Sequence, residues 1–112
     1  MMQLLVIVLN KLECLDKLLT ALEKEHIPGA TILDSRGMAQ QLEGHDELRF
    51  LGSLRMNPAH KENKMIFMVL DGEKVRTVSR VVNEVTGGLD QPDSGILFTV
   101  PISYVEGLGK YQ

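Results

Sequence analysis

The pattern of apolar and polar residues predicts a strand, a helix and a second strand in the first third of the chain. Residues 4–9 form an unbroken apolar run, as expected of a buried strand. Apolar residues then recur along one helical face, at Leu12, Leu15, Leu19 and Leu22. Pro28 and Gly29 end this helix, because proline lacks an amide hydrogen and clashes with the preceding turn. Residues 30–34 are partly β-branched and bounded by turn residues, which favours a second strand.

The same pattern recurs in the second half of the chain. Residues 65–70 and 96–101 are two more short apolar runs that predict strands. Between them one helical face carries four apolar residues, each 63 residues after its counterpart in the first helix: Val75, Val78, Val82 and Val85. The order β-α-β-β-α-β predicts a single α+β domain over residues 1–112. We expect a ferredoxin-like sandwich in which two helices cover one face of a four-stranded antiparallel sheet.

The two central strands predict a partner subunit. In this topology the strands at residues 4–9 and 65–70 lie side by side in the middle of the sheet, and both are continuously apolar. A sheet with one face in water would alternate apolar and polar residues, and two helices cover only one face. We therefore expect a second copy of the chain to cover the other face. The alternative is that Met68 and its neighbours lie under loops of the same chain.

Charge, cysteine content and aromatic content narrow the function classes. The net charge of −3 is opposite in sign to that of a surface that binds nucleic acid, and five aromatic residues are few for an RNA-recognition module. Cys14 is the only cysteine, which is typical of a reducing compartment. The apolar run at residues 4–9 is too short for a signal peptide or a membrane span. We expect a cytoplasmic protein that binds no nucleic acid and is not inserted in a membrane.

A long connection separates the second and third predicted strands. Two adjacent antiparallel strands need only a few residues to turn, whereas residues 36–63 are far more than that. The segment is rich in charged residues but also carries apolar side chains that can dock on a partner. We interpret it as a mobile interaction loop, with Glu47, Arg49 and Phe50 as partner-binding residues. The alternative is an inert insertion.

Four short motifs follow one another along the chain. They are Gly29-Ala30-Thr31, Arg36-Gly37 followed by Gln41, Gly44-His45-Asp46-Glu47-Leu48, and Thr86-Gly87-Gly88-Leu89. With these motifs and its two strand-helix-strand repeats, the chain resembles the PII signal-transduction family over nearly its whole length. The first motif is similar to the family's Gly-x-Thr, where the threonine lies near a bound adenine. The third is similar to a stretch early in the family's T-loop, and the fourth to the opening of its B-loop, which wraps ATP phosphates.

The resemblance implies a regulatory protein and not an enzyme. It implies a homotrimer that senses a small ligand, an adenine nucleotide such as ATP, ADP or AMP, at the clefts between subunits. Residues 36–63 would correspond to the T-loop, which controls a transporter or an enzyme of nitrogen metabolism, and residues 86–95 to the B-loop. The implied ligand-binding residues are Thr31, Gly37, Gln41, Thr86, Gly87, Gly88 and Leu89.

Departures from the family's pattern change the expected chemistry of this site. The family's B-loop contains a lysine that contacts phosphate, and an Arg-x-Arg after its last strand does the same, whereas residues 90–96 hold no cation. Asp90, Asp93 and Glu106 would repel a polyphosphate, because like charges near a protein surface are screened incompletely. We therefore expect weakened nucleotide binding. Backbone amides of residues 86–89 are the remaining candidates for an anion-binding nest.

Covalent modification, metal binding and catalysis have less support in the residues. Many family members are modified on a T-loop tyrosine, and no tyrosine lies between Arg36 and Lys64. The candidate metal ligands lack the usual ligand spacing: Cys14, His26, His45 and His60. No serine or cysteine motif has a recognisable base nearby in the sequence. The alternatives left open are a small ferredoxin-like enzyme and a metal-tolerance protein of the CutA type.

Overall fold

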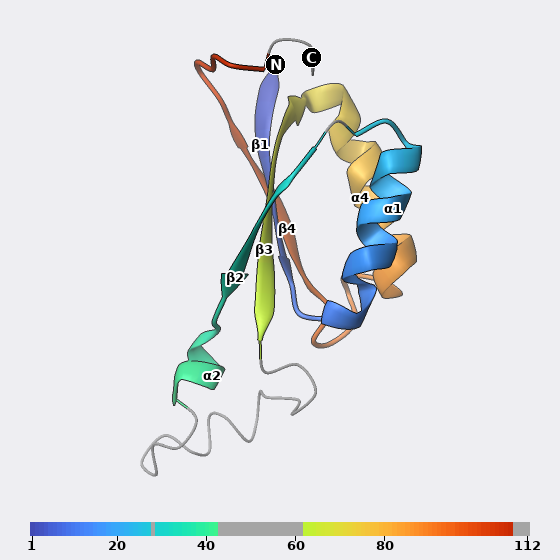
Figure 1. Cartoon of the computed structure of the whole chain (residues 1–112), viewed down its shortest axis with the longest axis vertical. Coiled ribbons are helices and arrows are strands. Elements are labelled where there is room, and N and C mark those ends of the chain that lie inside the picture. Colours follow the sequence, from blue (N-terminus) through green and yellow to red (C-terminus); the bar gives the residue numbers. More distant parts are fainter. Residues whose placement is uncertain (28, 43–61, 109–112) are drawn as a thin grey trace.

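The structure is a computed structural model that describes residues 1–27, 29–42 and 62–108. Its elements follow one another as β1 (Met2–Leu9), η1 (Leu12–Cys14), α1 (Leu15–Lys24), β2 (Thr31–Ser35), α2 (Met38–Leu42), β3 (Asn63–Asp71), η4 (Gly72–Lys74), α4 (Val75–Thr86) and β4 (Gly95–Pro101). The labels η1 and η4 denote single 3-10 turns that lead into α1 and α4. The two predicted repeats of strand, helix and strand are therefore present (Figure 1).

The sheet has the strand order β2-β3-β1-β4, and all neighbouring strands are antiparallel. Both α1 and α4 lie on the same side of this sheet, next to each other (Figure 1). The predicted fold class, an α+β ferredoxin-like sandwich, is confirmed. As predicted, the first strand of each repeat, β1 and β3, lies in the middle of the sheet.

The hydrophobic core fills the space between the sheet and the two long helices. Its buried members are Leu5, Ile7, Leu9, Leu18, Leu22, Ile27, Ile66, Met68, Leu70, Val78, Val81 and Val82. In α1 the buried face is rotated relative to the predicted one, because Leu18 is fully buried while Leu19 is only half-buried. The reason is that the first predicted position, Leu12, belongs to the 3-10 turn, whose tighter winding changes the phase of the following helix.

The opposite face of the sheet is also apolar, and none of the helices in the described residues covers it. The strand register puts the side chains of three strands there in rows: Leu4, Val6 and Val8 of β1, Met65, Phe67 and Val69 of β3, and Ile96, Phe98 and Val100 of β4. Val6 is only 3% exposed, because Phe67 and Phe98 flank it on the neighbouring strands. Phe98 itself is 44% exposed and Ile96 is 57% exposed. We refer to these nine residues as the open face.

The first part of the long connection contains an element that the sequence did not predict. Residues Met38–Leu42 form the short helix α2, which begins three residues after the end of β2. The rest of the connection, residues 43–61, lies outside the described residues, and with it Glu47, Arg49 and Phe50. None of the helices in the described ranges is long and apolar enough to cross a membrane.

Candidate functional site

The first group of predicted ligand-binding residues lies along and after β2. Thr31 is exposed at the start of this edge strand, opposite Phe67 of β3. Gly37 follows the strand, and its carbonyl oxygen accepts a hydrogen bond from the backbone amide of Gln41 at 3.0 Å. The structure therefore brings Gly37 and Gln41 together at the root of the long connection. Thr31 lies at the far end of the same strand.

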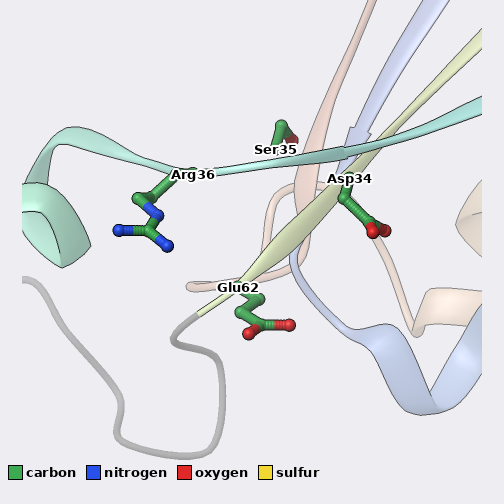
Figure 2. Close-up of a pocket in the computed structure, with 4 residues that line it drawn as sticks. All are labelled: Asp34, Ser35, Arg36 and Glu62. Carbon is green, nitrogen blue, oxygen red and sulfur yellow. The ribbon is translucent and has the colours of Figure 1, made fainter.

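A polar hollow of about 400 Å³ opens beside this root, where β2 ends and β3 begins (Figure 2). Its described lining residues are Asp34, Ser35, Arg36 and Glu62. The side chains of Asp34 and Arg36 lie on one side of the β2 ribbon, and Ser35 lies on the other (Figure 2). One guanidinium group and two carboxylates thus border the hollow.

The side chains of Ser35 and Asp34 fix the end of β2 to β3, and Ser35 contacts both the carbonyl oxygen and the Oδ1 atom of Asn63. The hydroxyl group of Ser35 donates a hydrogen bond to the carbonyl oxygen of Asn63 at 3.2 Å. Lys64 forms an ion pair with Asp34, its partner in the strand register. This hydrogen-bonded ion pair raises the pKa of Lys64 above its ordinary value of 10.5. The root of the long connection is therefore held to the sheet by a hydrogen bond and an ion pair.

The second group of predicted ligand-binding residues forms the turn that ends α4. Gly87 has a left-handed backbone conformation with φ of 87°, and its amide donates to the carbonyl oxygen of Asn83 at 3.1 Å. Glycine suits this helix-ending position because it has no Cβ. Thr86 is buried and donates from its hydroxyl group to the carbonyl oxygen of Val82 at 2.8 Å. The end of the helix is therefore sufficient to explain why a glycine occurs at this helix-ending position.

The amide groups of this turn donate hydrogen bonds within the chain. The amide of Gly88 donates to the Thr86 hydroxyl oxygen at 3.3 Å, and the amide of Leu89 donates to the Asn83 Oδ1 atom at 2.8 Å. The predicted anion-binding amides of Gly87, Gly88 and Leu89 are therefore engaged. A phosphate would have to replace these bonds, or bind beside them.

Two residues that contact this turn were not predicted from the sequence. The side chain of Asn83 accepts a hydrogen bond from the Leu89 amide, and Lys11 Nζ donates a hydrogen bond to the carbonyl oxygen of Thr86 at 2.8 Å. Lys11 comes from the other repeat of the chain, so no local motif marks it. For Asn83 the sequence does contain one signal. Asparagine side chains often form hydrogen bonds with nearby backbone groups, and this one lies in the last helical turn before a pair of glycines.

One of the three acidic residues that the sequence suggests for this site lies against the turn. A Cβ atom on Gly88 would lie 2.6 Å from the Asp90 Oδ1 atom, so this carboxylate lies directly against the turn. Asp93 follows in a left-handed conformation, with φ of 58°. Glu106 follows the other end of β4, where it accepts a hydrogen bond from the hydroxyl group of Tyr104, so within one chain it does not border the turn.

The two groups of predicted residues lie at opposite edges of the sheet. Gly37 and Gln41 follow β2, and Gly87, Gly88 and Leu89 precede β4, while β3 and β1 lie between these edge strands. Three strand spacings amount to about 14 Å. Within one chain the two groups therefore do not form a common site.

The other candidate chemistry involves single residues. In the part of the chain that the structure describes, no group of three or more His, Cys, Asp or Glu side chains is arranged to hold a metal ion. Cys14 is half-buried, and its thiol donates to the carbonyl oxygen of Val85 at 3.5 Å. His26 is exposed just after α1, with a left-handed φ of 61°. His45 and His60 lie outside the described residues.

Comparison with known proteins covers nearly the whole chain. The family model described as "Nitrogen regulatory protein P-II" matches residues 2–110. The crystal structure of Arabidopsis thaliana PII bound to citrate is similar, with a TM-score of 0.64 and 18% identity over 91% of this chain and 78% of that chain. A functionally unknown protein from Pediococcus pentosaceus ATCC 25745 is similar with a TM-score of 0.64 and 11% identity, over 95% of this chain and 96% of that chain. No match was found among curated protein sequences.

Proposed function

Since the chain belongs to the nitrogen regulatory protein P-II family, we propose that it is a trimeric regulator that senses an adenine nucleotide and controls a target protein through residues 36–63. Members of this family are regulators, and they act by binding other proteins. The family assignment supports the general role. The ligand, the trimer, the target and a place in nitrogen metabolism or transport are the parts that we propose.

One observation carries the proposal. The two groups of predicted ligand-binding residues lie at opposite edges of one sheet, so a site that contains both must join the β2 edge of one subunit to the β4 edge of another. A ligand that bridges Gln41 of one copy and Gly87 of the next would bind only to an assembly. Ligand binding and oligomerisation would then be coupled.

The open face of the sheet supports the assembly. Phe98, Ile96 and Val100 are exposed apolar side chains on the edge strand β4, and the neighbouring strand β1 is also apolar on this face. A contiguous apolar surface of this kind is typical of protein–protein contact, because its burial removes apolar area from water. A symmetric copy presents the same chemistry and is the partner that we propose.

The position of Gln41 supports a regulatory mechanism. Gln41 lies on α2, where the long connection leaves the sheet, so a ligand that contacts it acts on the root of the predicted interaction loop. A ligand shifts an equilibrium only if it binds one loop conformation more tightly than the other. The predicted contacts to the target, Glu47, Arg49 and Phe50, lie farther along the same connection.

Light scattering and calorimetry test the proposal together. We expect the mass of a trimer, 3 × 12.5 kDa, and a heat of binding with at least one of ATP, ADP and AMP, measured with and without Mg²⁺ and oxoglutarate. A monomer would contradict the subunit cleft. A dimer would favour the ferredoxin-like enzyme, and a trimer with no nucleotide binding would contradict the proposed ligand.

A matched pair of variants isolates the turn after α4. Both Asp and Asn tolerate the left-handed conformation of Gly87, so Gly87→Asp and Gly87→Asn differ mainly in charge. We expect Gly87→Asp to abolish nucleotide binding and Gly87→Asn to weaken it less, with the trimer unchanged in both. Equal affinities for the two variants would show that no phosphate approaches this turn.

A further inference from the structure

The connection between α4 and β4 is attached at both ends to two consecutive residues that follow β1. At its start, Lys11 Nζ donates a hydrogen bond to the carbonyl oxygen of Thr86 at 2.8 Å. At its end, the amide of Asn10 donates to the carbonyl oxygen of Ser94 at 3.1 Å. Residues 87–93 therefore extend between two attachment points, and a lysine forms one of them.

The charge of Lys11 has no described counterion. Its hydrogen-bond partner is a neutral carbonyl oxygen, and it forms no ion pair with any residue in the described ranges. A lysine ammonium group has three donor hydrogens, and one of them is used here. The side chain is half-buried, so its charge is screened less than that of a fully exposed lysine.

The ammonium group of Lys11 borders the exposed side of Gly87. A Cβ atom on Gly87 would lie 3.9 Å from Nζ, and beyond its two neighbours in the chain no other atom of the described residues lies within 4 Å of that position. The C-terminal end of a helix, such as that of α4, carries about half a negative charge, which repels anions. The full positive charge of Lys11 lies on that terminus and outweighs this repulsion.

The other attachment point has an unsatisfied polar group. Ser94 is 1% exposed, and its hydroxyl group has no hydrogen-bond partner among the described residues. A buried hydroxyl without a partner costs free energy that a bound ligand or water can recover. The two attachment points thus contain two groups with unused hydrogen-bonding capacity, the charged ammonium group of Lys11 and the hydroxyl group of Ser94.

We infer that Lys11 binds a phosphate group at the Gly87–Gly88 turn, which in the proposed function belongs to the nucleotide. This inference rests on the proposed function and assigns the cation that residues 90–96 lack. The ammonium group keeps its bond to Thr86 and donates a second one to a phosphate oxygen above Gly87. Lys11 is thus a ligand-binding residue contributed by the first repeat to a turn of the second.

Titration with pyrophosphate, followed by NMR, tests the inference without a nucleotide. The signals to follow are the amides of Gly87, Gly88 and Leu89 and the ammonium group of Lys11, with sodium chloride of equal ionic strength as the reference. We expect pyrophosphate to shift all of these signals in the wild type and the three amide signals in Lys11→Arg. Lys11→Gln should bind it about tenfold more weakly, as expected for loss of a charged hydrogen bond. Lys24→Gln, on the exposed side of α1, is the matched control and should bind like the wild type.

Adenosine separates phosphate binding from a purely structural role. We expect Lys11→Gln to lose about tenfold in affinity for AMP and to keep its affinity for adenosine, which has no phosphate. Equal losses for the two ligands would overturn the inference, because Lys11 would then only maintain the shape of the turn. If Lys11→Gln does not fold, the wild-type ammonium signal still decides the question.

The outcomes for the inference and for the proposed function are distinct. Absence of any pyrophosphate-induced shift in the wild type overturns the inference, even if adenine nucleotides bind elsewhere. Pyrophosphate binding that depends on Lys11, without binding of any adenine nucleotide, supports the inference and contradicts the proposed function.

Discussion

Gly95 lies so close to Val8 that a Cβ atom on Gly95 would be 2.3 Å from the Val8 carbonyl oxygen. Gly95 also has a φ of 142°, a conformation that other residues rarely adopt. Both features occur where the connection after α4 enters β4. The close approach allows β4 to pair with β1 from its first residue, so this glycine sets the start of the edge strand.

Replacing Gly95 by alanine should destabilise the fold by about 2 kcal/mol or more, because backbone strain and a steric clash add. Urea unfolding measures the change. Gly29→Ala is the control, since a Cβ atom there meets nothing within 4 Å and no left-handed φ is involved. Similar unfolding midpoints for the two variants would show that β1 and β4 can separate at little cost.

The fold was predictable because its signals are repeated and local. Apolar runs and helical periodicity specify the elements, and the repeat at a constant shift of 63 residues specifies their order. The phase of α1 was not predictable, because the 3-10 turn that contains Leu12 has no distinct pattern. The short helix α2 lacks the length that makes periodicity visible.

The site was predictable only in part, and the reason is the distance along the chain. The turn at Gly87 and Gly88 is marked by its own residues, whereas Lys11 reaches it from 75 residues away. Such a contact depends on how β1 and α4 pack, which no local motif encodes. Likewise, the acidic residues were visible in the sequence, but the contact of Asp90 with Gly88 was not.

A charge on the open face should prevent assembly. Phe98→Lys would bury an ammonium group next to Val6 if a second copy covered this face, and burial of an unpaired charge costs several kcal/mol. We expect light scattering to show dissociation of the trimer. Thr99→Lys is the matched control, because Thr99 is also exposed but points to the face that carries the helices. A trimer that survives Phe98→Lys would mean that subunits associate through another surface.

The side chain of Asn83 should govern the order of the turn after α4. Asn83→Ala removes the acceptor of the Leu89 amide and the donor to the carbonyl oxygen of Ser79, and should cost about 1–2 kcal/mol. Hydrogen exchange of the Leu89 amide should accelerate about tenfold in this variant. Asn83→Asp keeps an acceptor for Leu89, so its exchange should remain slow. Fast exchange in both variants would assign the protection of Leu89 to other groups.

The ion pair at the root of the long connection should be visible in the titration of Lys64. Its pKa is raised above 10.5, chiefly by the hydrogen bond to Asp34. A raised pKa in the folded state means that the stabilisation is fully present below pH 10.5 and is lost as the pH rises through the folded-state value. Asp34→Asn should therefore lower the pKa of Lys64, as measured by NMR. Glu62→Gln should lower it less, since Glu62 is the smallest of the contributions that raise it. Equal effects would mean that the two carboxylates act only through their charge.

Removal of the carboxylate of Asp90 should strengthen nucleotide binding. Asp90 Oδ1 lies against Gly88, where a phosphate would approach, and like charges a few ångströms apart near a surface repel by about 1 kcal/mol after screening. Asp90→Asn preserves the shape of the side chain and should raise the affinity for AMP several-fold, with a larger gain for ATP because its phosphate chain carries more charge. Calorimetry at low and high salt provides the check, because added salt should reduce the difference from the wild type.

Asp16→Asn, on the exposed side of α1, is the control and should leave both affinities unchanged. If Asp90→Asn increased the affinity for adenosine as much as for AMP, the effect would lie in the shape of the turn rather than in its charge.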